Sequence, residues 1–186
     1  MKDVAAQVYE RLLILRCQAG DAAALGELIA RYSPGVRFYL RKMAGQAAAD
    51  DLLQEVWVDV YRKINGLKRV DAFGAWVYRI ARDRAYRELR RRGVGRVWVD
   101  QEVVEGVVEE QEDGFSEEEA AGVRAALDGL PVEQREVLLL RFVEGMGYEE
   151  IAEVIGTAVG TVRSRIFYGK RALRMKLEVG NRKELR

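Results

Sequence analysis

The fold of this chain is decided by the stretch Gly147-Tyr-Glu-Glu-Ile-Ala-Glu-Val-Ile-Gly-Thr-Ala-Val-Gly-Thr-Val-Arg-Ser-Arg-Ile-Phe-Tyr168. It predicts a short helix over 148–155, a turn at Gly156-Thr157-Ala158, and a longer helix to about Leu177. This succession is the helix-turn-helix pattern, which places its second helix in the major groove of DNA. The first ligand class that the sequence indicates is therefore nucleic acid.

The second helix of this pattern has an apolar side and a basic side. Its apolar residues form one stripe at intervals of 4, 7 and 4, at Val162, Ile166, Leu173 and Leu177. The other side carries Arg163, Phe167, Lys170, Arg171 and Arg174. An arginine near a helix N-terminus can reach guanine O6 and N7, and the hydroxyls of Thr161 and Ser164 suit phosphates or base edges. A merely solvated basic face is the alternative, which the preceding helix and turn disfavour.

Composition limits what the 186 residues can do. The chain is 49% hydrophobic and has only two prolines, which favours helices. It has no histidine, which excludes histidine bases and the common zinc sites. The single cysteine, Cys17, excludes an intrachain disulfide and is interpreted as a buried apolar residue. No signal peptide or membrane-length apolar run is found, so we expect a cytoplasmic protein without metal or cofactor.

Charge is segregated along the chain, although the net charge is only +1. Basic residues dominate from Arg79 to Arg96, acidic residues from Asp100 to Glu119, and basic residues again from Arg163 to Lys176. This segregation indicates two small modules, and together with the helical composition and periodicity it predicts an all-α protein of two helical modules. The modules are residues 1–92 and 116–186, and an acidic linker over 93–115 joins them.

Five helices are predicted in the first module, over 4–17, 21–32, 34–45, 50–64 and 71–92. Asp21 and Asp71 are assigned as N-caps, and Pro34 as the first residue of its helix. Val8, Leu12 and Leu15 share one face of the first helix. In the second module a capping box at 116–119 begins a helix to Leu127, and Pro131 begins a helix that ends at Gly145.

The predicted helix over 71–92 is rich in arginine. Arg79, Arg82, Tyr86 and Arg90 follow at i, i+3, i+7 and i+11, and Arg87 lies beside them. Arginines interleaved with an aromatic ring suit partly single-stranded nucleic acid, because the charges follow phosphates and the ring stacks on bases. A solvated arginine face is the alternative.

The predicted helix over 50–64 exposes polar residues opposite its apolar stripe. They are Asp51, Gln54, Glu55, Val58, Asp59 and Arg62, with Val58 the one apolar member. Their spacing alone indicates no more than a solvated face.

These passages together resemble one family, the bacterial sigma-70-type initiation factors of the extracytoplasmic-function (ECF) group. Asp50-Asp-Leu-Leu-Gln-Glu55 resembles the family's second conserved region. Phe73-Gly-Ala-Trp-Val-Tyr-Arg-Ile-Ala-Arg82 with Leu89-Arg-Arg-Arg92 resembles the helix that meets the promoter minus-10 element. Leu130-Pro131, Tyr148-Glu-Glu-Ile-Ala152 and Gly160-Thr-Val-Arg-Ser-Arg165 resemble the fourth region, which recognises the minus-35 element. Gly169 departs from the family's usual residue and is expected to weaken its helix.

The resemblance implies roles for residues that spacing leaves unassigned. Asp51, Gln54 and Glu55 would bind the beta-prime coiled coil of core RNA polymerase, which the factor meets through its beta-prime and beta subunits. The loop over 66–70, with Lys68 and Arg69, would capture a flipped non-template base. Arg141, Arg163, Ser164 and Phe167 match positions that contact the minus-35 element. An anti-sigma factor is an expected further partner, and the acidic linker would run through polymerase channels.

Two other classes are open from the residues alone. One is a stand-alone helix-turn-helix regulator with an N-terminal sensing module, which would need a dimer interface and paired half-sites. The other is an enzyme with a helical accessory domain, which the lack of histidine and of clustered acids disfavours.

Overall fold

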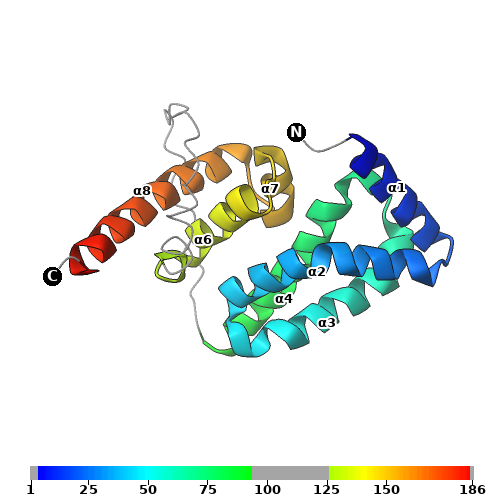
Figure 1. Ribbon diagram of the computed structural model, residues 1–186, viewed down its shortest axis with the longest axis horizontal. Helices are drawn as coiled ribbons and strands as arrows, with labels where there is room; N and C mark the ends of the chain where they lie inside the picture. Colours follow the sequence, from blue (N-terminus) through cyan, green and yellow to red (C-terminus); the bar gives the residue numbers. More distant parts are fainter. Residues whose placement is uncertain (1–3, 94–125, 185–186) are drawn as a thin grey trace. The chain divides into compact units, whose positions relative to one another are not determined.

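The computed structural model describes residues 4–93 and 126–184, with side chains as far as Leu177. The chain divides into two compact units, Met1–Gly95 and Arg96–Arg186. The first unit contains α1 (Val4–Gln18), α2 (Ala22–Ala44), α3 (Gln46–Lys63) and α4 (Phe73–Arg91), with single 3-10 turns at Ile64–Gly66 and Val70–Ala72 (Figure 1). The second contains α6 (Val132–Leu138), a π-helical turn (Leu139–Val143), α7 (Tyr148–Ile155) and α8 (Val159–Glu184).

The prediction of an all-α protein with two helical modules is confirmed, and no strand occurs within 4–93 and 126–184. The predicted capping box at 116–119 and the acidic linker, apart from Gly93, lie outside the described residues. The exact module boundaries therefore stay predictions.

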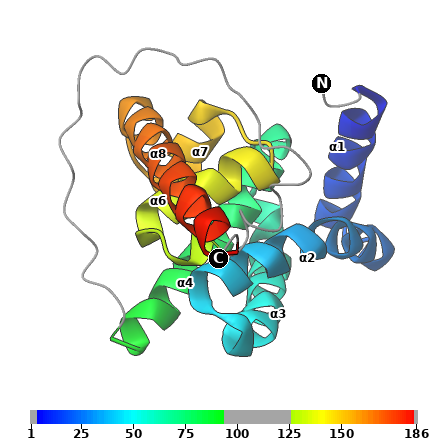
Figure 2. The same ribbon diagram turned by 60° about the vertical axis from the view of Figure 1, so that its left-hand side comes forward.

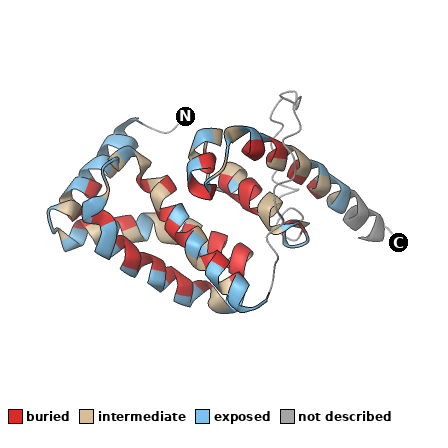
Figure 3. Ribbon diagram, turned by 180° about the vertical axis from the view of Figure 1, so that it is seen from behind, coloured by how far each residue is buried: buried red, intermediate tan, exposed pale blue. Residues whose placement is uncertain are grey.

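The core of the first unit forms where α2, α3 and α4 lie side by side, with α1 packed against α2 (Figures 1 and 2). Buried residues line the facing sides of these helices (Figure 3). Tyr39 and Tyr78 meet edge to face at 5.6 Å between ring centres, and Tyr32 and Phe73 meet at 5.3 Å. Such aromatic pairs stabilise a core beyond the area they bury. The packing leaves the outer faces of α3 and α4 in fixed directions.

The predicted helix break at Pro34 is wrong. Asp21 does cap α2, with its Oδ1 accepting from the N–H groups of Ala23 and Ala24 at 2.9 and 3.2 Å, but the helix continues through Pro34. An interior proline costs about 3 kcal/mol, because it removes one backbone hydrogen bond and crowds the preceding turn. Burial of one large apolar side chain stabilises by roughly 1.5–3 kcal/mol. The half of α2 beyond the proline buries several of them, at Val36, Tyr39, Leu40 and Met43, which outweighs the cost.

Other predicted helix ends differ by a few residues. Asp71 does not cap α4, because the Ala72 N–H donates to the Arg69 carbonyl at 3.1 Å and closes a 3-10 turn that contains Asp71. The helix α3 begins four residues before the predicted position 50, directly after Gly45. Pro131 is the N-cap of α6 rather than its first residue. The longest helix, α8, continues past Leu177 to Glu184.

The apolar residues of the first helix that were predicted to share a face are not the ones that enter the core. Val8, Leu12 and Leu15 do share a face of α1, but they are 60%, 49% and 52% exposed. The side that packs on α2 consists of Leu13, Ile14 and Cys17. The prediction that Cys17 is buried is confirmed, and burial raises the pKa of its thiol.

In the second unit, α6 and α8 approach each other closely at Gly169. A Cβ atom at this position would lie 3.1 Å from Cδ1 of Leu138, which is itself buried. Glycine lowers the helix propensity of α8 by about 1 kcal/mol relative to alanine, as expected. The structure adds the reason for its presence, since the missing side chain makes room for Leu138.

The C-terminal turn of α4 is tied to α2 through Glu88. The Glu88 carboxylate accepts hydrogen bonds from Arg91 at 2.7 Å and from Arg92 at 2.6 Å. Arg92 also donates from Nη1 to the carbonyl of Ala44, the last residue of α2, at 2.7 Å. The hydrogen bond from Arg91, with that from Arg92, lowers the pKa of Glu88 to about 2.

Acid should therefore weaken the first unit through Glu88. A carboxylate with a folded pKa near 2, below its ordinary 4.5, contributes stability that is complete above pH 4.5 and is lost as the pH falls toward 2. We expect Glu88→Gln to have a smaller loss of unfolding free energy than the native chain between pH 5 and pH 2.5. Urea unfolding followed by circular dichroism at each pH measures it. Parallel pH curves for the two chains would contradict the assignment.

Candidate nucleic-acid interface

The predicted helix-turn-helix is confirmed in its geometry. The helix α7 begins after Gly147, whose N–H donates to the Glu150 carboxylate at 2.8 Å, and ends at Gly156 in the left-handed region, with φ of 71°. Glycine adopts this conformation without steric cost, and the Gly156 N–H closes the helix on the Ala152 carbonyl at 2.9 Å. The turn then leads directly into α8 at Val159.

Two arginines meet at one aromatic ring beside this turn. The Arg141 guanidinium lies 4.9 Å from the centre of the Tyr148 ring, and the Arg163 guanidinium lies 5.5 Å from it. Arg141 comes from the π-helical turn, and its Nη1 also donates to the Met146 carbonyl at 2.9 Å. A ring face attracts cations, so Tyr148 can hold two like charges near each other. The arrangement concentrates positive charge where the first turns of α8 begin.

The sequence pattern did not indicate Tyr148 as a member of this group. Its position as the first residue of a short helix suggested only a helix start. Arg141 reaches the Tyr148 ring from the π-helical turn, in which the Glu144 N–H bonds to the Leu139 carbonyl at 3.1 Å. Such turns insert an extra residue and often occur at functional sites.

Three predicted DNA contacts lie in the core side of α8 instead. Thr161, Ser164 and Lys170 are only 7%, 6% and 8% exposed. The Ser164 hydroxyl donates to the Thr161 carbonyl at 3.0 Å, so it is used within the helix. This corrects the expectation that these side chains present their polar groups outward. Arg163 and Arg171 are exposed and Phe167 is half-buried, so the surface of α8 available to DNA centres on them.

On α4 the exposed row differs from the predicted one. It consists of Arg79, Asp83, Arg87 and Arg90, at i, i+4, i+8 and i+11. Tyr86 is 6% exposed, and the Arg82 guanidinium covers its ring at 4.4 Å. This corrects the expectation that Tyr86 offers a free ring for stacking, because one face is already occupied and the rest is in the core.

The loop between α3 and α4 places two further basic residues outward. Lys68 and Arg69 are exposed, and Arg69 Nη2 lies 3.9 Å from Asp71 Oδ2. The loop and the exposed arginine row of α4 belong to the same unit. Together they give this unit a second basic surface, separate from that of the helix-turn-helix.

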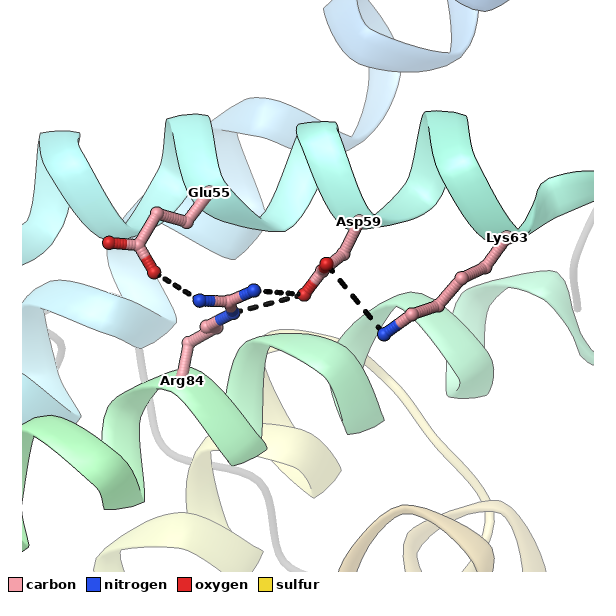
Figure 4. Close-up of polar contacts among 4 residues, drawn as sticks. All are labelled: Glu55, Asp59, Lys63 and Arg84. Carbon is pink, nitrogen blue, oxygen red and sulfur yellow. Dashed lines mark hydrogen bonds and ion pairs between the residues drawn. The ribbon is translucent and has the colours of Figure 1, made fainter.

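The outer face of α3 is acidic, and some of its carboxylates already bind a basic side chain of α4. Asp51, Gln54 and Glu55 are exposed as predicted, but Asp59 is 8% exposed, which corrects its assignment to the solvated face. Figure 4 shows the reason. Arg84 of α4 donates from Nε to Asp59 Oδ2 at 3.0 Å and from Nη1 to Glu55 Oε2 at 2.5 Å, while Lys63 Nζ lies 3.7 Å from Asp59 Oδ1.

This network pairs Arg84 with carboxylates, so Arg84 does not belong to the exposed arginine row of α4. It also links α3 to α4. Burial raises the pKa of Asp59, but the hydrogen bond and charge of Arg84, with Lys63, outweigh it and leave the pKa below its ordinary value. Asp59 is therefore ionised at neutral pH and requires its partner. The sequence held no signal of this pairing, because Asp59 and Arg84 are 25 residues apart.

Comparison with known proteins assigns each of the two units to a region of one family. The sequence profile of sigma-70 region 2 matches residues 28–94, and that of sigma-70 region 4 matches residues 120–173. The ECF RNA polymerase sigma-E factor of Escherichia coli K12 is 31% identical over 183 residues, 92% of this chain and 96% of that protein. The corresponding factor of Haemophilus influenzae is 30% identical over 94% of this chain and 98% of that protein.

Solved structures show the same fold. CnrH in complex with the cytosolic domain of CnrY matches with a TM-score of 0.68 at 23% identity, over 91% of this chain and 97% of that one. The sigma factor RpoE of Bartonella quintana in complex with the anti-sigma factor NepR matches with a TM-score of 0.64 at 23% identity, over 83% of this chain and 96% of that one.

A helical unit with region 2 character and a helix-turn-helix unit with region 4 character define a sigma factor of the sigma-70 type. The chain belongs to the ECF group of this family. It recognises promoters for RNA polymerase, and the stand-alone regulator is not favoured. Among the described residues, no group of cysteine and acidic side chains is arranged to hold a metal ion. Within residues 4–93 and 126–184, no helix is both long enough and apolar enough to cross a membrane.

Loss of Arg84 should destabilise the first unit, because Asp59 would stay buried and charged. Removing one partner of a buried ion pair costs about 3 kcal/mol. We expect Arg84→Met to have an effect of this size, and Asp59→Leu combined with Arg84→Met to recover most of it. Denaturant unfolding of the three chains measures the free energies.

Arg87→Met is the matched control for this comparison, because Arg87 is exposed on the same helix. We expect it to change stability by less than about 0.5 kcal/mol. Equal effects of Arg84→Met and Arg87→Met would mean that the network contributes nothing.

Proposed function

We propose that the first unit performs polymerase binding and promoter opening, and the second unit binds the minus-35 element. In this proposal residues 1–92 and 116–186 are the two functional domains, joined by the acidic linker over 93–115. The single observation that supports it best is the first unit itself, where an acidic face on α3 and an exposed arginine row on α4 lie on adjacent helices. A protein that only binds duplex DNA has no need of both surfaces. Catalysis belongs to the polymerase.

Asp51, Gln54 and Glu55 form the polymerase-binding face in this proposal. All three are exposed on α3, and their negative charge suits a basic partner surface such as the beta-prime coiled coil that the family resemblance implies. Glu55 shares its carboxylate with Arg84, so only part of its hydrogen-bonding capacity is open to a partner.

The minus-10 surface consists of the exposed row on α4 and the loop before it. Its basic members are Lys68, Arg69, Arg79, Arg87 and Arg90, with Arg82 at the edge. Positive side chains in a row follow the phosphates of a single strand and release its counterions. Because Tyr86 is covered, base stacking in this unit falls to the half-buried Trp76 or to the loop.

The minus-35 surface is centred on Arg163. Arg163 and Arg141 share the Tyr148 ring, and Phe167 and Arg171 lie farther along α8. An arginine at the start of a recognition helix can donate two hydrogen bonds to guanine. Thr161, Ser164 and Lys170 are buried in α8, so in this proposal they contribute less to the DNA-binding surface than Arg163 and Arg171.

An anti-sigma partner is part of the proposal. Of the two solved structures that share this fold, one holds the sigma factor RpoE with the anti-sigma factor NepR, and the other holds CnrH with the cytosolic domain of CnrY. We expect a comparable protein to cover the acidic face of α3 and so compete with polymerase. The protein would then act in the cytoplasm, where core polymerase is found.

Transcription with core polymerase tests this function. The protein is mixed with a bacterial core polymerase and a library of promoter fragments, and the transcripts are sequenced. We expect starts at a defined set of promoters that depend on the protein, and a loss of these starts when Asp51, Gln54 and Glu55 are changed to alanine together. Tight binding to an operator by the protein alone, with no transcription, would instead support the stand-alone regulator.

Arg163→Ala should relax recognition at one base pair of the minus-35 element. Loss of a bidentate contact to a base costs about 1–3 kcal/mol for the preferred base and much less for the others. Binding of the second unit to a set of single-base variants of its element measures this. Arg174→Ala, on the same helix and exposed, is the control. A uniform loss on every variant would make Arg163 a phosphate contact.

A further inference from the structure

The loop that carries Lys68 and Arg69 is fastened from another helix. Gln18, the last residue of α1, donates from its side-chain Nε2 to the Ile64 carbonyl at 2.9 Å and to the Leu67 carbonyl at 2.8 Å. These contacts join parts of the chain that are 46 and 49 residues apart. The sequence did not predict these two contacts, and neither of the proposed binding surfaces includes Gln18.

Besides Gln18, the loop is held by a 3-10 turn in which the Ala72 N–H donates to the Arg69 carbonyl at 3.1 Å, and by the ion pair of Arg69 with Asp71, but few of its side chains are buried. Only Ile64 is buried, whereas Asn65, Gly66, Lys68 and Arg69 are exposed. Within the loop, the Leu67 N–H donates to the Ile64 carbonyl at 3.0 Å and closes a single turn. The Gln18 side chain donates to the carbonyls of Ile64 and Leu67, the residues at the two ends of this turn. One amide group therefore fixes the turn from outside.

The chemistry suits glutamine in particular. A side-chain amide has two N–H donors on one nitrogen, and two carbonyl oxygens are available within reach. Methionine has a similar length and shape but no donor, and a glutamate carboxylate would repel both carbonyls. The contact therefore depends on the amide and not on volume.

We propose that Gln18 is a positioning residue for promoter opening, which holds the loop in the shape that captures a single-stranded base. It touches no DNA and acts through the backbone of residues 64–67. A loop held in its binding shape loses less conformational freedom when it binds, so its affinity is higher. The inference rests on the proposed role of the loop in minus-10 binding.

The expected effect is confined to one step. Gln18→Met should weaken binding of the non-template minus-10 strand by roughly tenfold. This is less than the full contribution of two ordinary hydrogen bonds, because only part of it reaches strand binding. Affinity for core polymerase and for the minus-35 duplex should not change, because Asp51, Gln54 and Glu55 lie far from the Ile64 end of α3 in sequence and the second unit takes no part in these contacts. Gln18→Glu should weaken strand binding at least as much.

The experiment uses the full-length protein assembled with core polymerase. Strand binding is measured with a fluorescent oligonucleotide of the non-template minus-10 sequence, and polymerase affinity is measured separately. Gln7→Met, an exposed position on the same helix, is the matched control and should leave both affinities unchanged. Hydrogen exchange at the backbone of residues 65–70 reports whether the loop itself has loosened.

The outcomes separate this inference from the proposed function. If Lys68→Ala with Arg69→Ala weakens strand binding and Gln18→Met adds nothing in that background, Gln18 acts through the loop as proposed. If Gln18→Met loosens the loop without any effect on strand binding, or lowers strand and polymerase affinity equally, the positioning role is wrong. If the Lys68 and Arg69 changes have no effect, the proposed role of the loop fails first.

Discussion

The Asp59–Arg84 ion pair is the contact on which the arrangement of the first unit depends. It joins the inner edge of α3, whose outer face carries the acidic residues, to α4, whose outer face carries the arginine row. A charge buried to this extent needs its partner in place, so the pair disfavours positions of the two helices that would separate Asp59 from Arg84. The same arginine also donates to Glu55, so the contact that joins the two helices reaches one of the two surfaces of this unit.

In the second unit the corresponding helices, α6 and α8, are positioned by close packing at Gly169. The surface that we propose binds DNA depends on how α8 lies on α6, and the missing side chain at Gly169 makes room for Leu138 between these helices. The π-helical turn then directs Arg141 back toward Tyr148 and Arg163. In both units the residues that position the surface are packed behind it.

The sequence predicted the helical class, the helix-turn-helix and the two basic regions, because these follow from local periodicity, glycine positions and charge order. It was wrong about the break at Pro34, because the packing of Val36, Tyr39 and Leu40 is a tertiary effect that overrides a local preference. It placed Asp59 and Tyr86 outward for a related reason. A helical repeat gives the direction of a side chain only to within a residue or so, and the neighbour that covers it comes from a distant part of the chain. Gln18 and Arg84 were missed because their partners are equally distant.

The close approach at Gly169 has a consequence for how relatives of this chain vary. Positions 138 and 169 share one small volume between α6 and α8, so the sizes of their side chains cannot vary independently. Alanine at the position of Gly169 needs the opposite side chain to shift by a few tenths of an ångström, whereas a larger residue needs a smaller side chain opposite it or a wider spacing of the two helices. The two positions should therefore change together across the family, and a chimaera that exchanges α8 alone between distant members would inherit half of a matched pair.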